Sequence, residues 1–497
     1  MSTLEKVSEL ESLKAAIENS CNEDAKKEAF SKGKLTARDR IKSLLDENSF
    51  VEIGAFIKSR STAFNMQDKE TPADGVICGY GTIQGNLVYV YSQDSTVLGG
   101  AIGEMHAKKI VRTYEDAIKM GVPIISLIDT AGIRLQEYVD ALDGYGSLFK
   151  IASEASGVIP QICGILGDCA GGASFIAGLS DFVFIASNNG KMYLNSPNTF
   201  DDKSASFDSV ASAKIHAEES GLAHFIAEKE EDLLGGIRTL ITYLPSNNNE
   251  EPPCYHCEDD LNRTDASLND FEIGKNSITD IIISLSDNSE YLEVSKQYGQ
   301  AAFIGFIRMD GSTVGIVANK EPVADYAAVK KMTQFVTLCD AFNIPIITLT
   351  NIERFESTPQ TEKLGMIKEC SKLTYSFASA TVPKINLILG TAYGSAYVAM
   401  NSKHIGADYV YAWPTAKVSA LDSECAVRIM YDEEIRSSEN AINTMTNKIT
   451  EFEEMNSSAY AVAARGYIDD IIEPAATRKR LMAALEVLST KQVDSLY

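Results

Sequence analysis

The sequence lacks any long apolar run, and this absence bears on where the protein acts. No stretch of about 18 apolar residues occurs, and the first twenty residues are charged from Glu5 onward. A membrane-spanning helix needs about 20 apolar residues in a row, and a secretory leader needs an apolar core of about 7–15 residues. We therefore expect neither a membrane span nor export, and predict a cytoplasmic protein.

The nine cysteines form no regular framework, which in a chain without an export signal predicts reduced thiols. One pair, Cys254 and Cys257 in CYHC, has the spacing of zinc ligands. A zinc ribbon needs a second such pair, and none follows. We interpret the pair as part of a surface segment and predict no metal site.

Positive charge is also scarce. Lys and Arg number 45 against 69 Asp and Glu, giving a formal net charge of −24 and a pI near 4.7. Nucleic-acid binding depends on clustered Lys and Arg that neutralise phosphates, so this composition argues against a nucleic-acid partner. Small acidic ligands remain open, because they need only a local basic pocket.

The 497 residues, 45% of them hydrophobic, exceed what one ordinary core accommodates, so two or more domains are expected. Residues 244–275 are rich in Pro, Asn and acidic side chains, as linkers often are. We predict an N-terminal domain over 1–243, a linker over 244–275 and a C-terminal domain over 276–497.

Three strand-like segments recur in the two halves. The matching pairs are GNLVYVYSQD with GSTVGIVANK, GVPIISLIDTAG with NIPIITLTNIER, and GVIPQICGILGDCAGGASF with ATVPKINLILGTAYGSAYV. Residues 103–120 and 329–342 have helical periodicity between the strands. Alternating strands and helices indicate a layered α/β fold. The sequence therefore predicts two copies of one α/β domain, related by internal duplication.

The repeat places two triplets of small residues in one register. Gly171–Gly172–Ala173 begins 11 residues after Pro160 (171 − 160), and Gly394–Ser395–Ala396 begins 11 residues after Pro383 (394 − 383). Each triplet follows an apolar strand and precedes a helix, where backbone N–H groups lack partners and the helix dipole is positive. Such a turn can hold an oxyanion. Tight packing of helix on sheet is the alternative, and the recurrence of the triplet favours the functional interpretation.

Several longer stretches make the chain resemble the carboxyltransferase component of biotin-dependent acyl-CoA carboxylases and decarboxylases. The stretches are GKLTARDRIKSLLDENSFVEIGAF (33–56), ADGVICGYGTIQGNLVYVYSQDSTVLGG (73–100), DTAGIRLQE (129–137), GDCAGGASFIAGLSDF (167–182), CDAFNIPIITL (339–349) and AYGSAYVAMNSKHIGADYVYAWP (392–414). The resemblance implies two tandem crotonase-like domains. It also implies a homo-oligomer, a dimer or a hexamer, in which the N half of one subunit faces the C half of another.

The resemblance also implies a chemistry and a set of site residues. An acyl-CoA thioester and the ureido group of biotin each form an enolate during carboxyl transfer, so two oxyanion holes are required and no side-chain base is needed. The amides of Gly171 and Gly172 would then serve the thioester, and those of Ser395 and Ala396 would serve biotin. The residues expected to line the substrate sites are Gly132, Arg134, Ala173, Gly394 and Val398.

Some of these positions leave alternatives open. Ser395 stands where the family commonly has glycine, and only its amide is needed. Arg134 either lines the CoA pocket or forms an ordinary ion pair. Val398, where the family tunes acyl-chain selectivity, is compatible with small acyl groups or with simple core packing. The segments NIERFEST (351–358) and VSALDSECAV (418–427) depart from the family pattern on the biotin side. His106 and His404 lack a visible partner, so we interpret both as structural.

The chain has neither a Met-Lys-Met biotin-attachment signature nor an ATP-binding glycine-rich carboxylase segment. The expected partners are therefore a separate biotin carboxyl carrier protein and either a biotin carboxylase or a membrane decarboxylase subunit that pumps sodium. The sequence leaves both directions open. A scaffold paralogue without activity is a second hypothesis. A single-substrate enoyl-CoA hydratase or isomerase is a third, which the duplicated site disfavours.

Overall fold

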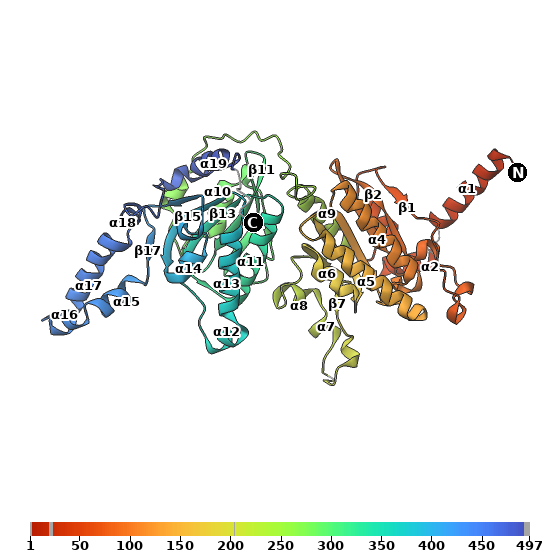
Figure 1. The fold of residues 1–497 in the computed structure, drawn as a ribbon, viewed down its shortest axis with the longest axis horizontal. Helices are drawn as coiled ribbons and strands as arrows, with labels where there is room; N and C mark the ends of the chain where they lie inside the picture. The colour runs from red at the N-terminus through yellow and green to blue at the C-terminus, as the bar shows by residue number, and fades with distance from the viewer. Residues whose placement is uncertain (1, 19–22, 203, 492–497) are drawn as a thin grey trace. The chain divides into compact units, whose positions relative to one another are not determined.

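The computed structural model describes residues 2–18, 23–202 and 204–491. The chain forms two compact units, residues 1–250 and 251–497 (Figure 1). The division falls inside the segment 244–275; its role as a linker between domains of residues 1–243 and 276–497 stays a prediction. Within the described residues, no helix is both long enough and apolar enough to cross a membrane.

The first unit contains, over its described residues, one sheet of eight strands in the order β1-β2-β3-β4-β5-β6-β8, with β7 paired to the end of β5. The strands are β1 (Val51–Ile53), β2 (Val76–Ile83), β3 (Asn86–Gln93), β4 (Ile124–Thr130), β5 (Gln161–Ala170), β6 (Phe182–Ala186), β7 (Lys191–Tyr193) and β8 (Phe225–Ala227). Strands β3 to β8 pair in parallel, while β1 and β2 are antiparallel. The central strands β4 and β5 are buried almost throughout, as strands covered on both faces are.

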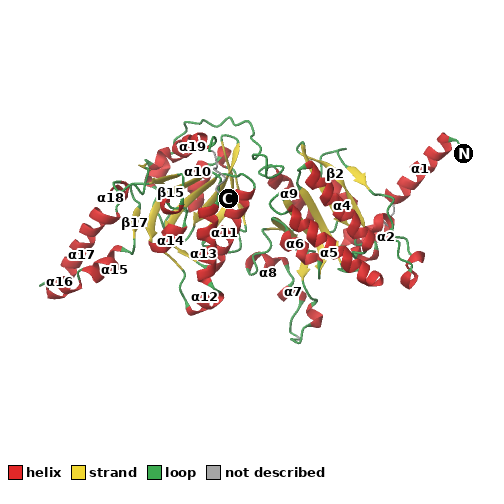
Figure 2. Ribbon diagram, viewed as in Figure 1, coloured by secondary structure: helices red, strands yellow, loops and turns green. Residues whose placement is uncertain are grey.

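Helices cover both faces of this sheet. On one face, α4 (Glu104–Met120), α5 (Tyr138–Ala155) and α6 (Ala173–Leu179) pack side chains such as Ile110 and Leu148 into the core (Figure 2). Successive residues of a strand point to opposite faces of the sheet. On the face opposite to α4, α5 and α6, Gly164 of β5 lies against α9 (Glu230–Ile241). Helix α4 ends at Gly121, whose φ of +61° suits a left-handed cap.

The second unit repeats the arrangement. Over its described residues the sheet order is β18-β16-β15-β13-β11-β10-β9, with β17 paired to the end of β15. The strands are β9 (Tyr291–Val294), β10 (Ala302–Met309), β11 (Ser312–Asn319), β13 (Ile346–Ile352), β15 (Lys384–Tyr393), β16 (Tyr409–Ala412), β17 (Lys417–Ser419) and β18 (Asp470–Ile471). The helices that correspond to α4, α5 and α6 are α11 (Tyr326–Ala341), α13 (Met366–Ser379) and α14 (Gly394–Ala399).

The elements predicted from the repeat are confirmed one by one. The three recurring segments form β3, β4 and β5 in the first unit and β11, β13 and β15 in the second. The predicted helices over 103–120 and 329–342 are α4 and α11, the latter beginning three residues earlier at Tyr326, after the Asp325 cap. Even the irregularity near the end of the central strand pair recurs, between Ile128 and Thr130 and between Thr350 and Ile352.

The remaining elements lie around the two sheets. They are α1 (Thr3–Glu18), α2 (Glu23–Ser31), α3 (Ala37–Leu44), α7 (Phe207–Val210), α8 (Ala213–Glu218), α10 (Ile278–Leu285), β12 (Val323–Ala324), β14 (Arg354–Phe355), α12 (Pro359–Leu364), α15 (Ser423–Met430), α16 (Asp432–Ser437), α17 (Ala441–Phe452), α18 (Ala459–Ala463) and α19 (Thr477–Leu488). In each unit, a buried arginine forms an ion pair between the first and the last part of the unit's sequence. Arg40 of α3 pairs with Glu230 of α9, and Arg478 of α19 pairs with Asp287 after α10.

Candidate active site

The two sequence-predicted turns lie at equivalent edges of the two sheets. In the first unit, Thr130 at the end of β4 pairs with Cys169 near the end of β5. In the second unit, Ile352 of β13 pairs in the same way with Ala392 of β15. The turns that follow β5 and β15 therefore stand at the carboxyl ends of parallel strands, where α/β sheets bind ligands.

The first turn uses one of its amides for the fold itself. Gly171 has φ +60°, and its N–H donates to the carbonyl of Tyr193 in β7 at 2.9 Å. The N–H of Gly171 thus has an acceptor within the fold, and its expected service to a ligand stays a prediction. The next two amides, of Gly172 and Ala173, donate to no acceptor among the described residues, as is usual in the first turn of a helix.

The second turn shares with the first the backbone angle of its first glycine and two amides that follow it. Gly394 has φ +58°, matching Gly171, and the amides of Ser395 and Ala396 donate to no acceptor within the described part of the chain. Ser395 is exposed and Ala396 is buried. The donor pair Ser395–Ala396 is thus in register with Gly172–Ala173, since 395 − 383 and 172 − 160 are both 12. Two adjacent N–H groups at each turn can hold one partly negative oxygen.

Arg134 is not placed to bind a substrate through its side chain. It is 0% exposed, and its Nη1 donates to Asp74 at 2.7 Å and to Glu137 at 2.9 Å. Its Nη2 donates to the carbonyl of Ala101 at 2.9 Å. Of the two alternatives from the sequence, the structure therefore supports the ion pair, in a buried form. Gly132 is also buried, and its N–H donates to Oγ1 of Thr130.

On the second unit, Val398 is half-buried in α14 and packs against a small core cluster that includes Tyr397. This position is consistent with the core-packing alternative, and a role in acyl-chain selectivity stays a prediction. The atypical segment NIERFEST is ordered: its first two residues end β13, and Arg354 and Phe355 form β14, which pairs with β12. The departure from the family pattern therefore leaves the turn at Ser395 intact.

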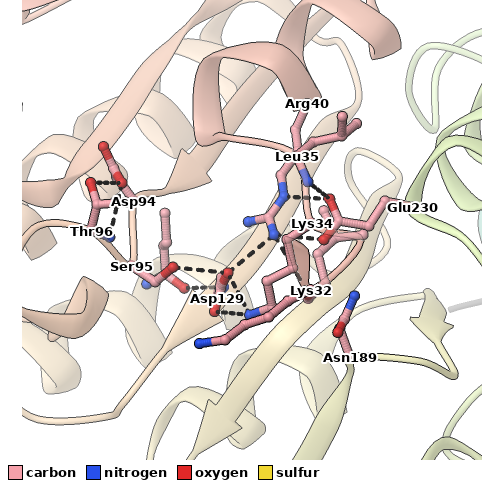
Figure 3. A network of polar contacts seen from close by, with 12 residues as sticks. Lys32, Lys34, Leu35, Arg40, Asp94, Ser95, Thr96, Asp129, Asn189 and Glu230 are labelled. Atoms are coloured by element: carbon pink, nitrogen blue, oxygen red, sulfur yellow. Dashed lines mark hydrogen bonds and ion pairs between the residues drawn. The ribbon is translucent and has the colours of Figure 1, made fainter. Parts of the chain in front are cut away.

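A buried network of charges adjoins the end of β4 and was not assigned from the sequence. The carboxylate of Asp129 accepts from Lys34 at 3.1 and 3.2 Å and from Arg40 at 3.1 Å. Arg40 also binds Glu230 through two contacts of 2.7 and 2.8 Å. Figure 3 shows Ser95 reaching Asp129 from one side and Arg40 and Lys34 from the other. The network fastens the N-terminal segment to the strand that leads into the Gly132 turn.

The second unit has an uncharged residue at the position of Asp129, and its partner lies in the neighbouring strand β15. Asn351 occupies the place of Asp129, since 351 − 345 and 129 − 123 are both 6. Its Oδ1 accepts from the N–H and hydroxyl of Thr391 at 3.1 and 3.0 Å. The family-like stretches contain Lys34, Arg40 and Asp129, and this was the signal in the sequence that could have marked them as important. A sequence pattern does not reveal, however, that Arg40 and Asp129, 89 positions apart, are in contact.

Two other sequence expectations concern His106 and the CYHC pair. His106 is fully buried; its Nδ1–H donates to the carbonyl of Asp74, and its Nε2 accepts from Gln93. Burial lowers the pKa of this imidazole well below its ordinary value, so it stays neutral. No group of His, Cys, Asp and Glu with the geometry of a metal site occurs among the described residues, Cys254 and Cys257 included.

Two α/β domains in tandem, each with its central strands leading into a strand-to-helix turn, define a protein with two crotonase-like domains. A crystal structure of transcarboxylase 12S with methylmalonyl-coenzyme A bound has the same fold. Its TM-score is 0.96 at 37% identity, covering 100% of this chain and 97% of that chain.

The chain belongs to the carboxyl transferase domain family, whose profile matches residues 28–497. It is 40% identical over 471 residues to methylmalonyl-CoA decarboxylase subunit alpha of Propionigenium modestum, covering 93% of this chain and 91% of that protein. It is 39% identical to the carboxyltransferase subunit of propionyl-CoA carboxylase of Haloferax mediterranei, covering 93% and 92%. It is therefore a biotin-dependent acyl-CoA carboxyltransferase, with acyl-CoA as substrate and biotin on a carrier as cofactor.

Proposed function

We propose that the protein moves a carboxyl group between biotin on a separate carrier protein and a short-chain acyl-CoA, of the acetyl-, propionyl-, malonyl- or methylmalonyl-CoA class. The observation that carries this proposal is the pair of free amides at each turn, Gly172–Ala173 and Ser395–Ala396, in one register of the duplicated fold. One donor pair suffices for an enzyme with a single oxyanion, and this chain has two.

Each donor pair takes one oxygen. The amides of Gly172 and Ala173 hold the thioester oxygen as the acyl-CoA becomes an enolate, and those of Ser395 and Ala396 hold the ureido oxygen of biotin. When bound, biotin would supply the exchange of a carboxyl group for a proton: in carboxylation it would give its carboxyl group to the α-carbon and receive the α-proton, and in decarboxylation it would receive the carboxyl group while its own N–H proton goes to that carbon. These N–H groups point at oxygens that gain negative charge only during reaction, so their binding energy lowers the barrier.

The donors of the second turn fit the ureido group on two observations. A ureido oxygen is a hydrogen-bond acceptor. The N–H groups of Ser395 and Ala396 have no acceptor in the described residues, so they can donate to such an oxygen. The exposed position of Ser395 leaves the turn open to a group brought from outside. Gly394, with φ +58°, permits the sharp entry into α14 that presents both amides together.

The direction of the reaction separates two versions of the proposal. With an ATP-dependent biotin carboxylase as partner, the chain carboxylates an acyl-CoA. With a membrane decarboxylase subunit, it removes the carboxyl group from an acyl-CoA and loads the carrier. Relatives of both kinds have nearly the same identity to this chain, 40% and 39%. In both versions we expect a homo-oligomer, a dimer or a hexamer, and the relative named above is described as a hexamer.

Exchange of a radiolabelled carboxyl group tests the function directly. Purified protein is incubated with free biotin and with labelled malonyl-, methylmalonyl- or glutaconyl-CoA in turn, and label on biotin is measured. We expect transfer from methylmalonyl-CoA to be fastest, because the two relatives described above are named for methylmalonyl-CoA and for its decarboxylated product, propionyl-CoA. A folded protein that transfers label from none of the three compounds contradicts the proposal and supports the scaffold hypothesis.

A substitution of Gly172 tests the first donor pair. A Cβ at this position lies 2.8 Å from Cε1 of Tyr145, so Gly172→Ala forces the turn or the ring to move. We expect exchange to fall by about 10- to 100-fold, because displacement by about 1 Å at a reacting centre has effects of that size. The control is Gly178→Ala in α6, where a Cβ meets nothing within 4 Å. Equal activities of the two variants would remove Gly172 from the site.

A further inference from the structure

Each unit buries one lysine at the same place in the helix that follows its antiparallel strand pair. Lys109 of α4 is 4% exposed and Lys331 of α11 is 2% exposed. They are in register, because each precedes the proline at the start of the next strand by 14 residues (123 − 109 and 345 − 331). The duplication has therefore kept a lysine where a helix faces its core.

The two ammonium groups have the same kind of partner. Nζ of Lys109 donates to the carbonyls of Ala73, at 2.7 Å, and Val76. Nζ of Lys331 donates to the carbonyls of Tyr298, at 2.7 Å, and Ser295, at 3.4 Å. In both units the acceptors stand 36 and 33 residues before the lysine. Each lysine thus holds the segment that leads into the second strand of its sheet, residues 73–76 before β2 and residues 295–298 before β10.

Burial of these two lysines costs free energy, because a charged group loses its hydration. Neither Nζ has a carboxylate partner among the ion pairs of the described residues. Burial lowers the pKa of both groups, that of Lys331 to about 7, where the nearby charge of Lys320 adds to the effect. An apolar side chain of similar length would avoid this desolvation. An apolar side chain, however, could not donate hydrogen bonds to the two carbonyls that each lysine binds.

The held segments adjoin the edges that carry the donor turns. Val76 at the start of β2 pairs with Gln93 at the end of β3, and β3 is parallel to β4. The start of β2 therefore lies at the edge where β4 and β5 end. Ala302 at the start of β10 pairs in the same way with Asn319 at the end of β11.

In the first unit a further connection links the held segment to a site turn. Asp74, between the two acceptors of Lys109, binds Arg134, and Arg134 follows Gly132 by two residues. The second unit has Glu356 at the place of Arg134 (356 − 345 and 134 − 123 are both 11), so it lacks this pair. The lysine is the component that both units share.

We propose that Lys109 and Lys331 are positioning residues, one for each half-site, which hold the segments 73–76 and 295–298 against the sheet edges where the amide pairs act. The proposal rests on the proposed function only for its kinetic consequence. Its structural part does not depend on that function: each lysine keeps one segment, and the turn beside it, ordered.

The test compares Lys109→Met and Lys331→Met by hydrogen–deuterium exchange and by carboxyl exchange. We expect Lys331→Met to speed deuterium uptake in peptides covering 295–301 and 391–400, with 71–76 and 168–177 unchanged. Lys109→Met should speed deuterium uptake in peptides covering 71–76 and 168–177 and leave 295–301 and 391–400 unchanged. In the carboxyl exchange, we expect KM for free biotin to rise at least about tenfold in Lys331→Met and KM for acyl-CoA to rise similarly in Lys109→Met, each with the other KM preserved.

Two controls keep the outcome decisive. Lys108→Met removes a neighbouring exposed lysine that pairs with Glu104, and it should change none of these measurements. Lys109→Gln and Lys331→Gln keep an N–H donor and serve if a methionine variant does not fold. Faster uptake confined to the held segments, with the turns and both KM values unchanged, overturns the proposal, as does a uniform loss of protection throughout a unit. An inactive wild-type protein would reject the proposed function, while deuterium uptake would still decide the role of the lysines.

Discussion

Replacing Ser395 by proline is expected to lower carboxyl exchange about 10²–10³-fold, whereas replacing it by alanine leaves the rate near that of the unchanged protein. Proline removes one N–H from the second donor pair, and loss of one oxyanion donor has effects of this size. Ser395 is exposed and stands in the first turn of α14, where a proline ring is tolerated and no intrahelical bond is lost. Alanine keeps the N–H and removes only the hydroxyl.

The measurement is the initial rate of label transfer from methylmalonyl-CoA to free biotin, with circular dichroism to establish that the fold is retained. Binding of acyl-CoA, followed by calorimetry, should be the same in both variants, because the donors that we propose for it are at Gly172 and Ala173. If the proline variant retains full exchange, Ser395 does not supply a catalytic amide. If the alanine variant loses as much as the proline variant, the hydroxyl of Ser395 is the active group instead.

Replacing Arg40 by methionine is expected to destabilise the first unit by about 3–5 kcal/mol, because it leaves the buried charge of Glu230 without its cation. Arg40 is 1% exposed and Glu230 is 0% exposed. Burial opposes the charge of the guanidinium, but the hydrogen bond with Glu230 and the charges of Glu230 and Asp129 outweigh it and raise its pKa. Removal of the cation therefore leaves Glu230 with the N–H of Leu35 but no cation among its ion pairs in the described residues, while Asp129 keeps Lys34 and Ser95.

Urea unfolding, followed by fluorescence and by circular dichroism, measures the loss. The control is Arg112→Met, which removes an exposed arginine from the same unit; its contact with Asp116 is 3.7 Å long. Such a surface pair contributes about 0–1 kcal/mol. A loss at Arg40 no larger than at Arg112 would mean that the carboxylates find other partners or take up protons.

The repeat in the sequence predicted the fold well, because β4, β5, β13 and β15 are rich in apolar residues and are preceded by prolines at nearly constant spacing. It also predicted the two strand-to-helix turns that follow β5 and β15. It gave no sign of the hydrogen bond from Gly171 to Tyr193, because this acceptor lies in a short strand with no repeat signal of its own. Arg134 could not be resolved either, since its partner Asp74 lies 60 residues away. Side-chain contacts across such separations follow from packing, which a linear pattern does not encode.

The buried arginines that join the ends of each unit have a consequence for synthesis on the ribosome. Arg40 and Glu230 are 190 residues apart, and Asp287 and Arg478 are 191 residues apart. Neither pair forms until almost the whole unit has been translated, and contacts of such long range form late. Until then a nascent half exposes an arginine or an acid that waits for its counterpart, together with unfinished sheet edges. The growing chain is thus most vulnerable to aggregation shortly before each half is completed, at two separate times during translation.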